Sequence, residues 1–167
     1  MDDAEGVRAL AGNPAIYATT LNVPHPYEEG MAEKWIATHA VSFYERRGLC
    51  LAVCEKDRGQ LAGTVSFGIA NPHQRAELGW WIGEPFWNRG YCTEAAAALV
   101  AYGFENFPIR KFTSHYLASN PASGRVMQKI GMQQEGYLHQ HVVKEGVRHD
   151  IVLYGLLKPR LGEAPGC

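Results

Sequence analysis

The sequence predicts a single α/β (α+β) domain, 1–167, in which helices flank a mixed, mostly antiparallel sheet. The predicted elements run two helices, three strands, helix, strand, helix and two strands, an order that packs into one layered domain. Short turns join several consecutive strands, and such turns connect antiparallel neighbours. The chain has 167 residues, 46% of them apolar, which is enough for one hydrophobic core.

The first half of the chain predicts two helices and then three strands. A helix is expected over about 3–11, and a second over about 28–47, where Met31, Trp35 and Ile36 lie on one side at helical spacing. A proline-containing loop separates the two helices. The strands are expected at about 49–55, 60–69 and 76–82.

The second half predicts two helices that alternate with strands. The run 92–106 is apolar nearly all round, as in a helix packed deep against a sheet. A further helix begins at Asn120-Pro121, because Asn is a favoured N-cap and Pro suits the first helical position, and Gly131 is placed to end it. The strands are expected at 111–117, 134–143 and 147–157, and the breaker-rich tail 162–167 is expected to fray.

Bulk properties exclude several functional classes. A net charge of −1 gives no reason to expect nucleic acid or an anionic membrane as a partner. No apolar run approaches the roughly 20 residues of a membrane span, and the acidic start, Met1-Asp2-Asp3, is typical of neither a signal nor a transit peptide. The four cysteines form no Cys-x-x-Cys pair and have no suitably spaced histidine, so we expect no metal, and reduced thiols in the cytoplasm.

The most informative stretch is the turn between the third strand and the alanine-rich helix, Glu84 to Ala95. A strand, a glycine-containing turn and a helix start form an anion cradle, because the first backbone N–H groups of a helix lack intrahelical partners and the helix dipole adds positive charge. The chain has neither the dinucleotide fingerprint Gly-x-Gly-x-x-Gly nor the P-loop sequence Gly-Lys-Ser/Thr. Spacing alone fits a phosphate site and an ordinary connection equally well.

Four stretches together carry a family resemblance: Glu77 to Gly83, Phe86 to Ala95, Asn120-x-x-Ser123 and Lys129 to Met132. They resemble the GNAT superfamily of acetyl-CoA-dependent N-acetyltransferases, and most closely its branch of ribosomal-protein N-terminal (alanine/serine) acetyltransferases. The resemblance extends from about residue 13 to residue 157. It implies a GNAT-like fold, acetyl-CoA as co-substrate and a primary amine as acceptor.

The resemblance also implies where the cofactor binds. Backbone N–H groups of about Arg89 to Thr93 would hold the pyrophosphate of CoA, with further hydrogen bonds from the side chains of Arg89 and Thr93. The family has Gly or Ala at the last position of this turn, where the chain has Cys92. The implied cofactor-binding residues are Trp81, Ile82, Trp87, Asn88, Arg89, Gly90, Tyr91, Cys92, Thr93, Asn120 and Ser123.

A second departure from the family lies at the N-terminus. The family begins with a strand before the first helix, whereas this chain begins at about that helix, so the first strand is expected to be missing. Its absence would leave a sheet edge to cover, and a homodimer, which the resemblance also allows, is one way to do so. A deleted strand, a shortened chain and a misassigned start all remain open.

Acetyl transfer to an amine needs a base, donors for the carbonyl oxygen and a proton for the leaving thiolate. Glu77 is the candidate base, since partial burial beside apolar neighbours would raise its pKa; the alternative is a structural ion pair. Ser123 is the candidate acid, because it lies three residues after Asn120 on the same helix face, and the position where many members carry Tyr is Met127 here. We expect Asn120 to cap the helix and to contact the cofactor; alternatively, it and Ser123 only support the first turn.

The acceptor pocket is expected to involve His115 or Tyr116, on the strand that faces the cofactor across the sheet. By resemblance, Tyr27 and Trp35 would form further walls; alternatively, both are core aromatics. His139 and His141 share one strand face, but without a third ligand they are expected to be exposed rather than bound to a metal.

We therefore expect a cytoplasmic enzyme that transfers acetyl from acetyl-CoA to a primary amine by direct attack. Cys92 is a poor nucleophile candidate, because it lies at the phosphate end of the implied site. The first acceptor class is a protein N-terminal amino group, and the alternative is a small amine: a polyamine, an amino acid or an aminoglycoside. A second alternative is a non-catalytic acyl-CoA-binding regulatory module.

Overall fold

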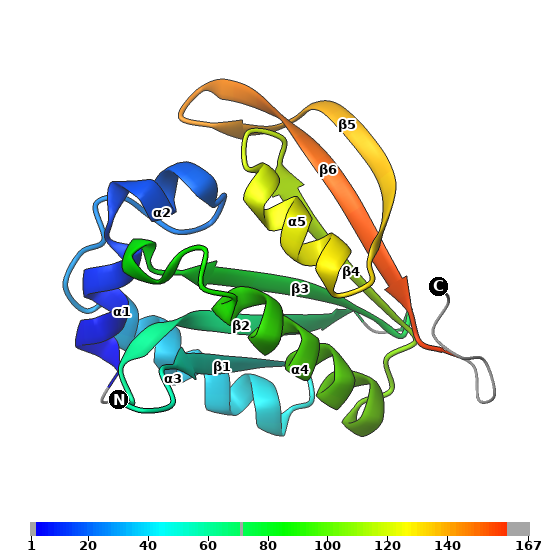
Figure 1. Cartoon of the computed structure of the whole chain (residues 1–167), viewed down its shortest axis with the longest axis horizontal. Coiled ribbons are helices and arrows are strands. Elements are labelled where there is room, and N and C mark those ends of the chain that lie inside the picture. The colour runs from blue at the N-terminus through cyan, green and yellow to red at the C-terminus, as the bar shows by residue number, and fades with distance from the viewer. Residues whose placement is uncertain (1–2, 71, 160–167) are drawn as a thin grey trace.

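The computed structural model describes residues 3–70 and 72–159, which form one six-stranded sheet flanked by helices (Figure 1). The strands are β1 (Gly48–Cys54), β2 (Leu61–Ala70), β3 (Arg75–Ile82), β4 (Lys111–Leu117), β5 (Gln133–Lys144) and β6 (Val147–Leu157). The helices are α1 (Ala4–Ala11), α2 (Pro14–Thr19), α3 (Met31–Tyr44), the short 3-10 helix η1 (Glu84–Phe86), α4 (Tyr91–Asn106) and α5 (Pro121–Lys129). The strand order is β1-β2-β3-β4-β6-β5, and only β3 and β4 pair in parallel. The predicted fold class is confirmed.

The helix α2 is the main element that the sequence prediction missed. It begins with the Asn-Pro pattern that was predicted to start the helix at Asn120-Pro121. The backbone N–H of Ala15 donates to the side chain of Asn13 at 2.8 Å, and Pro14 occupies the first helical position. Its 6 residues are too few for an apolar repeat to show. The predicted tail, 162–167, lies outside the described residues.

The two parallel strands at the centre of the sheet separate soon after they meet. Their register covers three residue pairs, and the last of these is Glu77 opposite Thr113. Just beyond it, the hydroxyl of Ser114 donates to the carbonyl oxygen of Leu78 at 3.0 Å. From there β3 and β4 diverge toward their carboxyl ends, as Figure 1 shows. An opening between the carboxyl ends of parallel strands is where open α/β sheets bind ligands.

Helices cover the sheet through two separate apolar clusters. In the main cluster, which includes α4 and α5, Phe112 is fully buried between the rings of Phe67 and Phe104. The second cluster joins α1, α2 and α3 to Leu61 and Trp81 of the sheet. Because side chains alternate along a strand, β3 presents different residues to each cluster. The main cluster continues from β3 to β4 and β6, whereas the second cluster lies on the β1–β3 side of the divergence alone.

The edge strand β1 pairs with β2 alone. Within 3–70 and 72–159 no strand precedes it, which agrees with the sequence expectation for the first family strand. None of the described helices is long and apolar enough to span a membrane.

Candidate active site

The turn before α4 has the geometry of an anion cradle. Gly90 occupies the N-cap position with φ +87°, in the left-handed region that glycine adopts without strain, and Asn88 has φ +60°. The first bond of the helix runs from the backbone N–H of Glu94 to the carbonyl of Gly90 at 3.1 Å. In the described part of the chain, the backbone N–H groups of residues 88–93 therefore have no hydrogen-bond partner. Such a row of free donors at a helix start binds phosphate.

Three adjoining cavities extend from this turn into the opening between β3 and β4. The cavity at the turn has about 210 Å³, the middle cavity about 300 Å³, and the cleft at the far end about 420 Å³. The first two share Ile82, Trp87, Asn88, Cys92, Ala122, Arg125 and Val126, and the last two share Thr19, Thr20, Trp80, Trp81 and Ser123. Shared walls make them one continuous channel. Every predicted cofactor-binding residue except Arg89 lines it.

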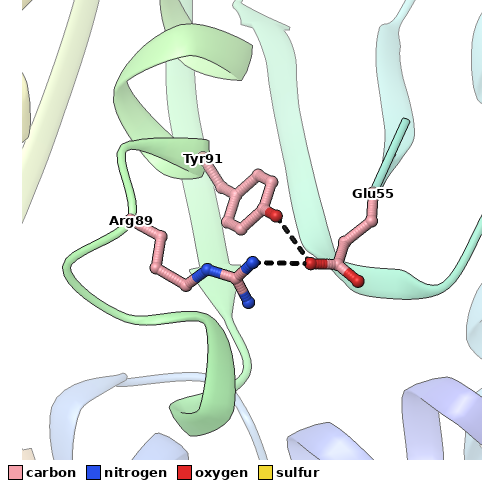
Figure 2. A network of polar contacts seen from close by, with 3 residues as sticks. All are labelled: Glu55, Arg89 and Tyr91. Atoms are coloured by element: carbon pink, nitrogen blue, oxygen red, sulfur yellow. Dashed lines mark hydrogen bonds and ion pairs between the residues drawn. The ribbon is translucent and has the colours of Figure 1, made fainter. Parts of the chain in front are cut away.

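Arg89 braces the turn instead of lining the channel. Its guanidinium group donates to the carboxylate of Glu55 at 2.8 Å, and the hydroxyl of Tyr91 donates to the same oxygen at 2.7 Å. Figure 2 shows both side chains directed toward Glu55. The hydrogen bond from Tyr91, followed by the charge of Arg89, holds the pKa of the Glu55 carboxyl below its usual range. Glu55 thus holds both residues that flank Gly90, and the predicted contact of the Arg89 side chain with phosphate stays a prediction.

We expect that Glu55→Gln raises the KM for acetyl-CoA about fivefold, because a weaker brace lets the turn before α4 leave its binding conformation. The kcat at saturating acetyl-CoA is expected to stay within about twofold of wild type. Initial rates over a range of acetyl-CoA concentrations measure both constants. The control is Glu45→Gln, which breaks the exposed ion pair of Glu45 with Arg47. Equal KM values in the two variants would show that the brace has no role.

The sequence prediction missed two cations that line the channel. Arg125 and Lys129 lie four residues apart in α5 and line the cavity at the turn, where the free N–H groups also lie. Residues at this spacing share one helix face, so their spacing after Asn120-Pro121 was the available signal. In the same cavity, burial raises the pKa of the Cys92 thiol to about 12, which keeps it protonated and a poor nucleophile.

Ser123 lies where the middle cavity meets the cleft. Its hydroxyl oxygen accepts a hydrogen bond from the indole N–H of Trp80 at 3.0 Å, which leaves the hydroxyl hydrogen available to donate. Asn120 lines the middle cavity but does not cap α5 with its side chain; its amide donates to the carbonyl of Thr19 at 3.0 Å. The expected side-chain cap is therefore wrong, because the amide is used to hold the end of α2.

Glu77 lies in the cleft, at the last position where β3 pairs with β4. One of its carboxylate oxygens lies 2.8 Å from Nδ1 of His115, and its side chain is 55% exposed. The hydrogen bond to His115 lowers the pKa of Glu77 and outweighs the effect of partial burial. The expected upward shift of this pKa is therefore wrong. His115 joins Glu77 as a polar pair at the point where β3 and β4 separate.

The remaining predicted residues divide between the cleft and the core. Trp35 and Tyr116 line the cleft. The ring of Tyr116 also packs closely against α5: a Cβ atom added at Gly124 would lie 2.7 Å from Cζ of Tyr116. Tyr27 does not line the cleft; it packs against the second apolar cluster and borders a separate hollow beside α1. This position agrees with the alternative that Tyr27 is a core aromatic. In 3–70 and 72–159 no group of three metal-ligating side chains occurs.

The backbone of β3 adds a further donor to the site. The hydroxyl of Ser114 donates to the carbonyl of Leu78, and the indole N–H of Trp87 donates to that of Ile82, so both carbonyls point away from β2. The backbone groups of every second residue in a strand point to the same side, and Trp80 lies between these two residues, so its N–H and C=O also point away from β2. β4 pairs with β3 only up to Glu77. The N–H of Trp80 thus faces the channel beside Ser123.

Comparisons with known proteins agree with this geometry. Residues 1–133 match the model of the acetyltransferase (GNAT) domain family. The chain is 33% identical over 126 residues to the uncharacterized N-acetyltransferase YoaA of Bacillus subtilis (strain 168), an alignment that covers 75% of this chain and 71% of YoaA. The chain covers only 55 to 61% of three other curated relatives that it matches.

Two solved structures share the fold. One is RimL, a ribosomal L7/L12 alpha-N-protein acetyltransferase in complex with coenzyme A, with a TM-score of 0.84, 21% identity, and coverage of 93% of this chain and 89% of RimL. The other is the spermidine N-acetyltransferase from Vibrio cholerae in complex with CoA and spermine, with a TM-score of 0.77, 19% identity, and coverage of 93% and 90%. Through the family match and the relationship to YoaA, the chain belongs to the GNAT family of acetyl-CoA-dependent N-acetyltransferases.

Proposed function

We propose that the protein acetylates the α-amino group of a protein or peptide N-terminus, in the cytoplasm, by direct attack of the amine on acetyl-CoA. The observation that carries this proposal is the continuous channel, which has a phosphate cradle at one end and a cleft with a single carboxylate at the other. The half-buried, protonated thiol of Cys92 and the free cysteines Cys50 and Cys54 suit a reducing compartment.

The cofactor fits the channel in one direction. The free N–H groups before α4, together with Arg125 and Lys129, supply the donors and positive charge that a pyrophosphate needs. The middle cavity leads from there to Trp80 and Ser123. The acetyl thioester would then lie between β3 and β4, where the channel meets the cleft that contains Glu77.

The residues at this junction can perform each step of the transfer. Glu77 attracts the ammonium group and accepts its proton, directly or through water, so that the free amine attacks the thioester carbon. The N–H of Trp80 stabilises the negative charge that develops on the carbonyl oxygen. The carbon–sulfur bond then breaks, and Ser123 donates its proton to the CoA thiolate and regains one from the attacking nitrogen, directly or through water. The products are an N-acetylated amine and CoA, and no acetyl-enzyme forms.

The charge of the cleft favours a monoamine over a polyamine. Among the described residues that line the cleft, Glu77 is the one carboxylate, and hydroxyl groups and aromatic rings supply most of the remaining wall. A polyamine carries several ammonium groups, each of which needs a compensating acceptor. A peptide α-amino group carries one charge and continues as an uncharged backbone, which a wall rich in hydroxyl groups accommodates.

We expect that Ser123→Ala lowers kcat about 10- to 100-fold, because the leaving thiolate loses its proton donor. The KM for the acceptor should change less than threefold, since Ser123 acts on the departing group. Thiol release under saturating conditions measures kcat. Ser42→Ala in α3, outside the channel, is the matched control. A kcat for Ser123→Ala equal to that of Ser42→Ala would remove Ser123 from the mechanism.

An amine panel tests the proposed acceptor class. Purified protein is given acetyl-CoA and, in turn, peptides with a free or a blocked N-terminus, spermidine, single amino acids and an aminoglycoside, and free CoA thiol is followed over time. We expect thiol release with peptides that have a free N-terminus, and none with peptides that have a blocked N-terminus and no lysine. Faster release with spermidine would favour a polyamine acetyltransferase. No release with any amine, despite measurable CoA binding, would favour the non-catalytic module.

A further inference from the structure

A short segment after the first turn of α2 closes over the place where the cleft meets the middle cavity. This closing segment, residues 17–23, comprises the end of α2 and the loop after it. Ile16, just before it, is 1% exposed in the second apolar cluster, and Val23 packs against the same cluster. Thr19 and Thr20 line both the cleft and the middle cavity, and the loop residues after them line the cleft alone. The segment is therefore a wall of the acceptor site carried by the β1–β3 side of the sheet.

The opposite side of the sheet holds this segment through Lys144, at the end of β5. Its ammonium group donates to the carbonyl oxygens of Tyr17 and Thr20, the latter at 2.8 Å, and lies 3.6 Å from the ring centroid of Tyr17. Asn120 adds its hydrogen bond to the carbonyl of Thr19. Figure 1 shows the β5–β6 turn close to α2, across the opening between β3 and β4. Three carbonyl oxygens of one short segment are thus held from the far side of the divergence.

These contacts suit a lysine in particular. The last carbonyl groups of a helix lack intrahelical partners, and an ammonium group satisfies them and interacts favourably with the helix end. The group also lies against an aromatic face, which adds a cation–π contribution. Without Lys144, the carbonyl of Thr20 would lose this hydrogen bond, and that of Tyr17 would keep only the one from the backbone N–H of Thr20, so the segment would be held less firmly in one conformation.

We propose that Lys144 is a positioning residue that holds the closing segment 17–23 across the acceptor cleft, so that the amine binds in a closed site. This inference rests on the proposed function for the identity of the substrate, but the contact itself can be tested without activity. It predicts that loss of the ammonium group weakens acceptor binding more than it weakens binding of acetyl-CoA, since the loop residues 21–23 line the cleft alone.

The test compares three variants. Lys144→Met keeps the aliphatic stem and removes the donor, and Lys144→Arg restores a positive donor. Lys158→Met is a matched control, because Lys158 also donates to a helix carbonyl, that of Phe104 in α4, at the other end of β6. For Lys144→Met we expect the acceptor KM to rise about tenfold, as for loss of a charge-assisted hydrogen bond. The Kd for CoA, from calorimetric titration, should stay within about threefold, and Lys144→Arg should recover part of the loss.

Hydrogen exchange of the backbone amides supplies a readout that needs no acceptor. In Lys144→Met, amides of residues 17–23 should exchange at least about tenfold faster than in wild type, while Lys158→Met leaves them unchanged. Unchanged exchange of these amides in Lys144→Met would overturn the proposal, as would an acceptor KM equal to that of Lys158→Met. If no amine is acetylated, the proposed function fails, and faster exchange still supports the contact.

Discussion

Replacing Glu77 with glutamine is expected to lower kcat/KM for a peptide acceptor about 100- to 1,000-fold, the range usual for a lost general base. The substitution keeps the size of the side chain and its hydrogen bond with His115, but it removes the charge that attracts an ammonium group and accepts its proton. Glu77 is also the one carboxylate among the described residues of the cleft, so no neighbour replaces it. Steady-state thiol release at several peptide concentrations measures the loss.

A matched carboxylate far from the site controls for general effects of the substitution. Glu105→Gln changes an exposed residue near the end of α4 that lines none of the three cavities. Its kcat/KM should stay within about twofold of wild type. A loss in Glu77→Gln smaller than tenfold would contradict a catalytic role for Glu77 and leave it as a structural partner of His115.

The pKa of Glu77 gives the same prediction a pH dependence. Because its pKa is lowered in the folded protein, the carboxylate is charged throughout the range above pH 5, and its contribution to stability is lost only as the pH falls through that lowered pKa. Titration of Glu77 therefore causes no change in kcat/KM near neutral pH. Because Glu77 attracts and deprotonates the ammonium form, we expect kcat/KM to stay level from about pH 5 and to fall above the pKa of a peptide α-amino group, about 7.7–8.0. Glu77→Gln, which needs an amine that is already neutral, should instead rise up to that pKa, and a limb between pH 5 and 7 that vanishes in Glu77→Gln would contradict this assignment.

The second large effect is expected at the phosphate end of the channel. The double variant Arg125→Ala, Lys129→Ala should raise the Kd for CoA at least about 100-fold, because each cation forms a charge-assisted contact worth roughly 1.5–3 kcal/mol. The free N–H groups before α4 remain, so binding is weakened rather than abolished. Calorimetric titration with CoA measures Kd, and the wild-type Kd should rise with added salt more steeply than that of the variant.

A double variant of equal charge controls for the change in net charge. Arg148→Ala, Lys56→Ala removes two exposed cations that line none of the three cavities. Its Kd for CoA should stay within about twofold of wild type. Equal values in the two double variants would mean that Arg125 and Lys129 do not contact the cofactor phosphates.

The sequence contained the local features of the fold and site but not the partners of long side chains. The apolar periodicity of α4 and the glycine at the turn before it are properties of neighbouring residues, so both could be predicted. The ion pair of Arg89 could not be predicted, because its partner, Glu55, lies 34 positions earlier and reaches the turn only through the fold. The pKa of Glu77 was predicted in the wrong direction for the same reason, since its partner His115 belongs to another strand.

The residues that line the cleft also depend on contacts between segments distant in the sequence. Tyr27 is an aromatic residue in the loop that resembles a pocket wall, yet the second apolar cluster takes it up. The end of α2, a helix too short to show a periodic pattern, lines the cleft instead, and Lys144 of a distant hairpin holds it there. Such contacts join segments that lie far apart in the sequence, which local pattern does not encode.

The most direct test of the account uses one peptide that offers two amines. A peptide with a free N-terminus and one internal lysine is incubated with acetyl-CoA and wild-type protein, and fragment mass spectrometry locates any acetyl group. We predict a single acetyl group on the N-terminal nitrogen, formed together with one equivalent of free CoA thiol and lost in Glu77→Gln. An acetyl group on the lysine, or none while CoA binds normally, would contradict it.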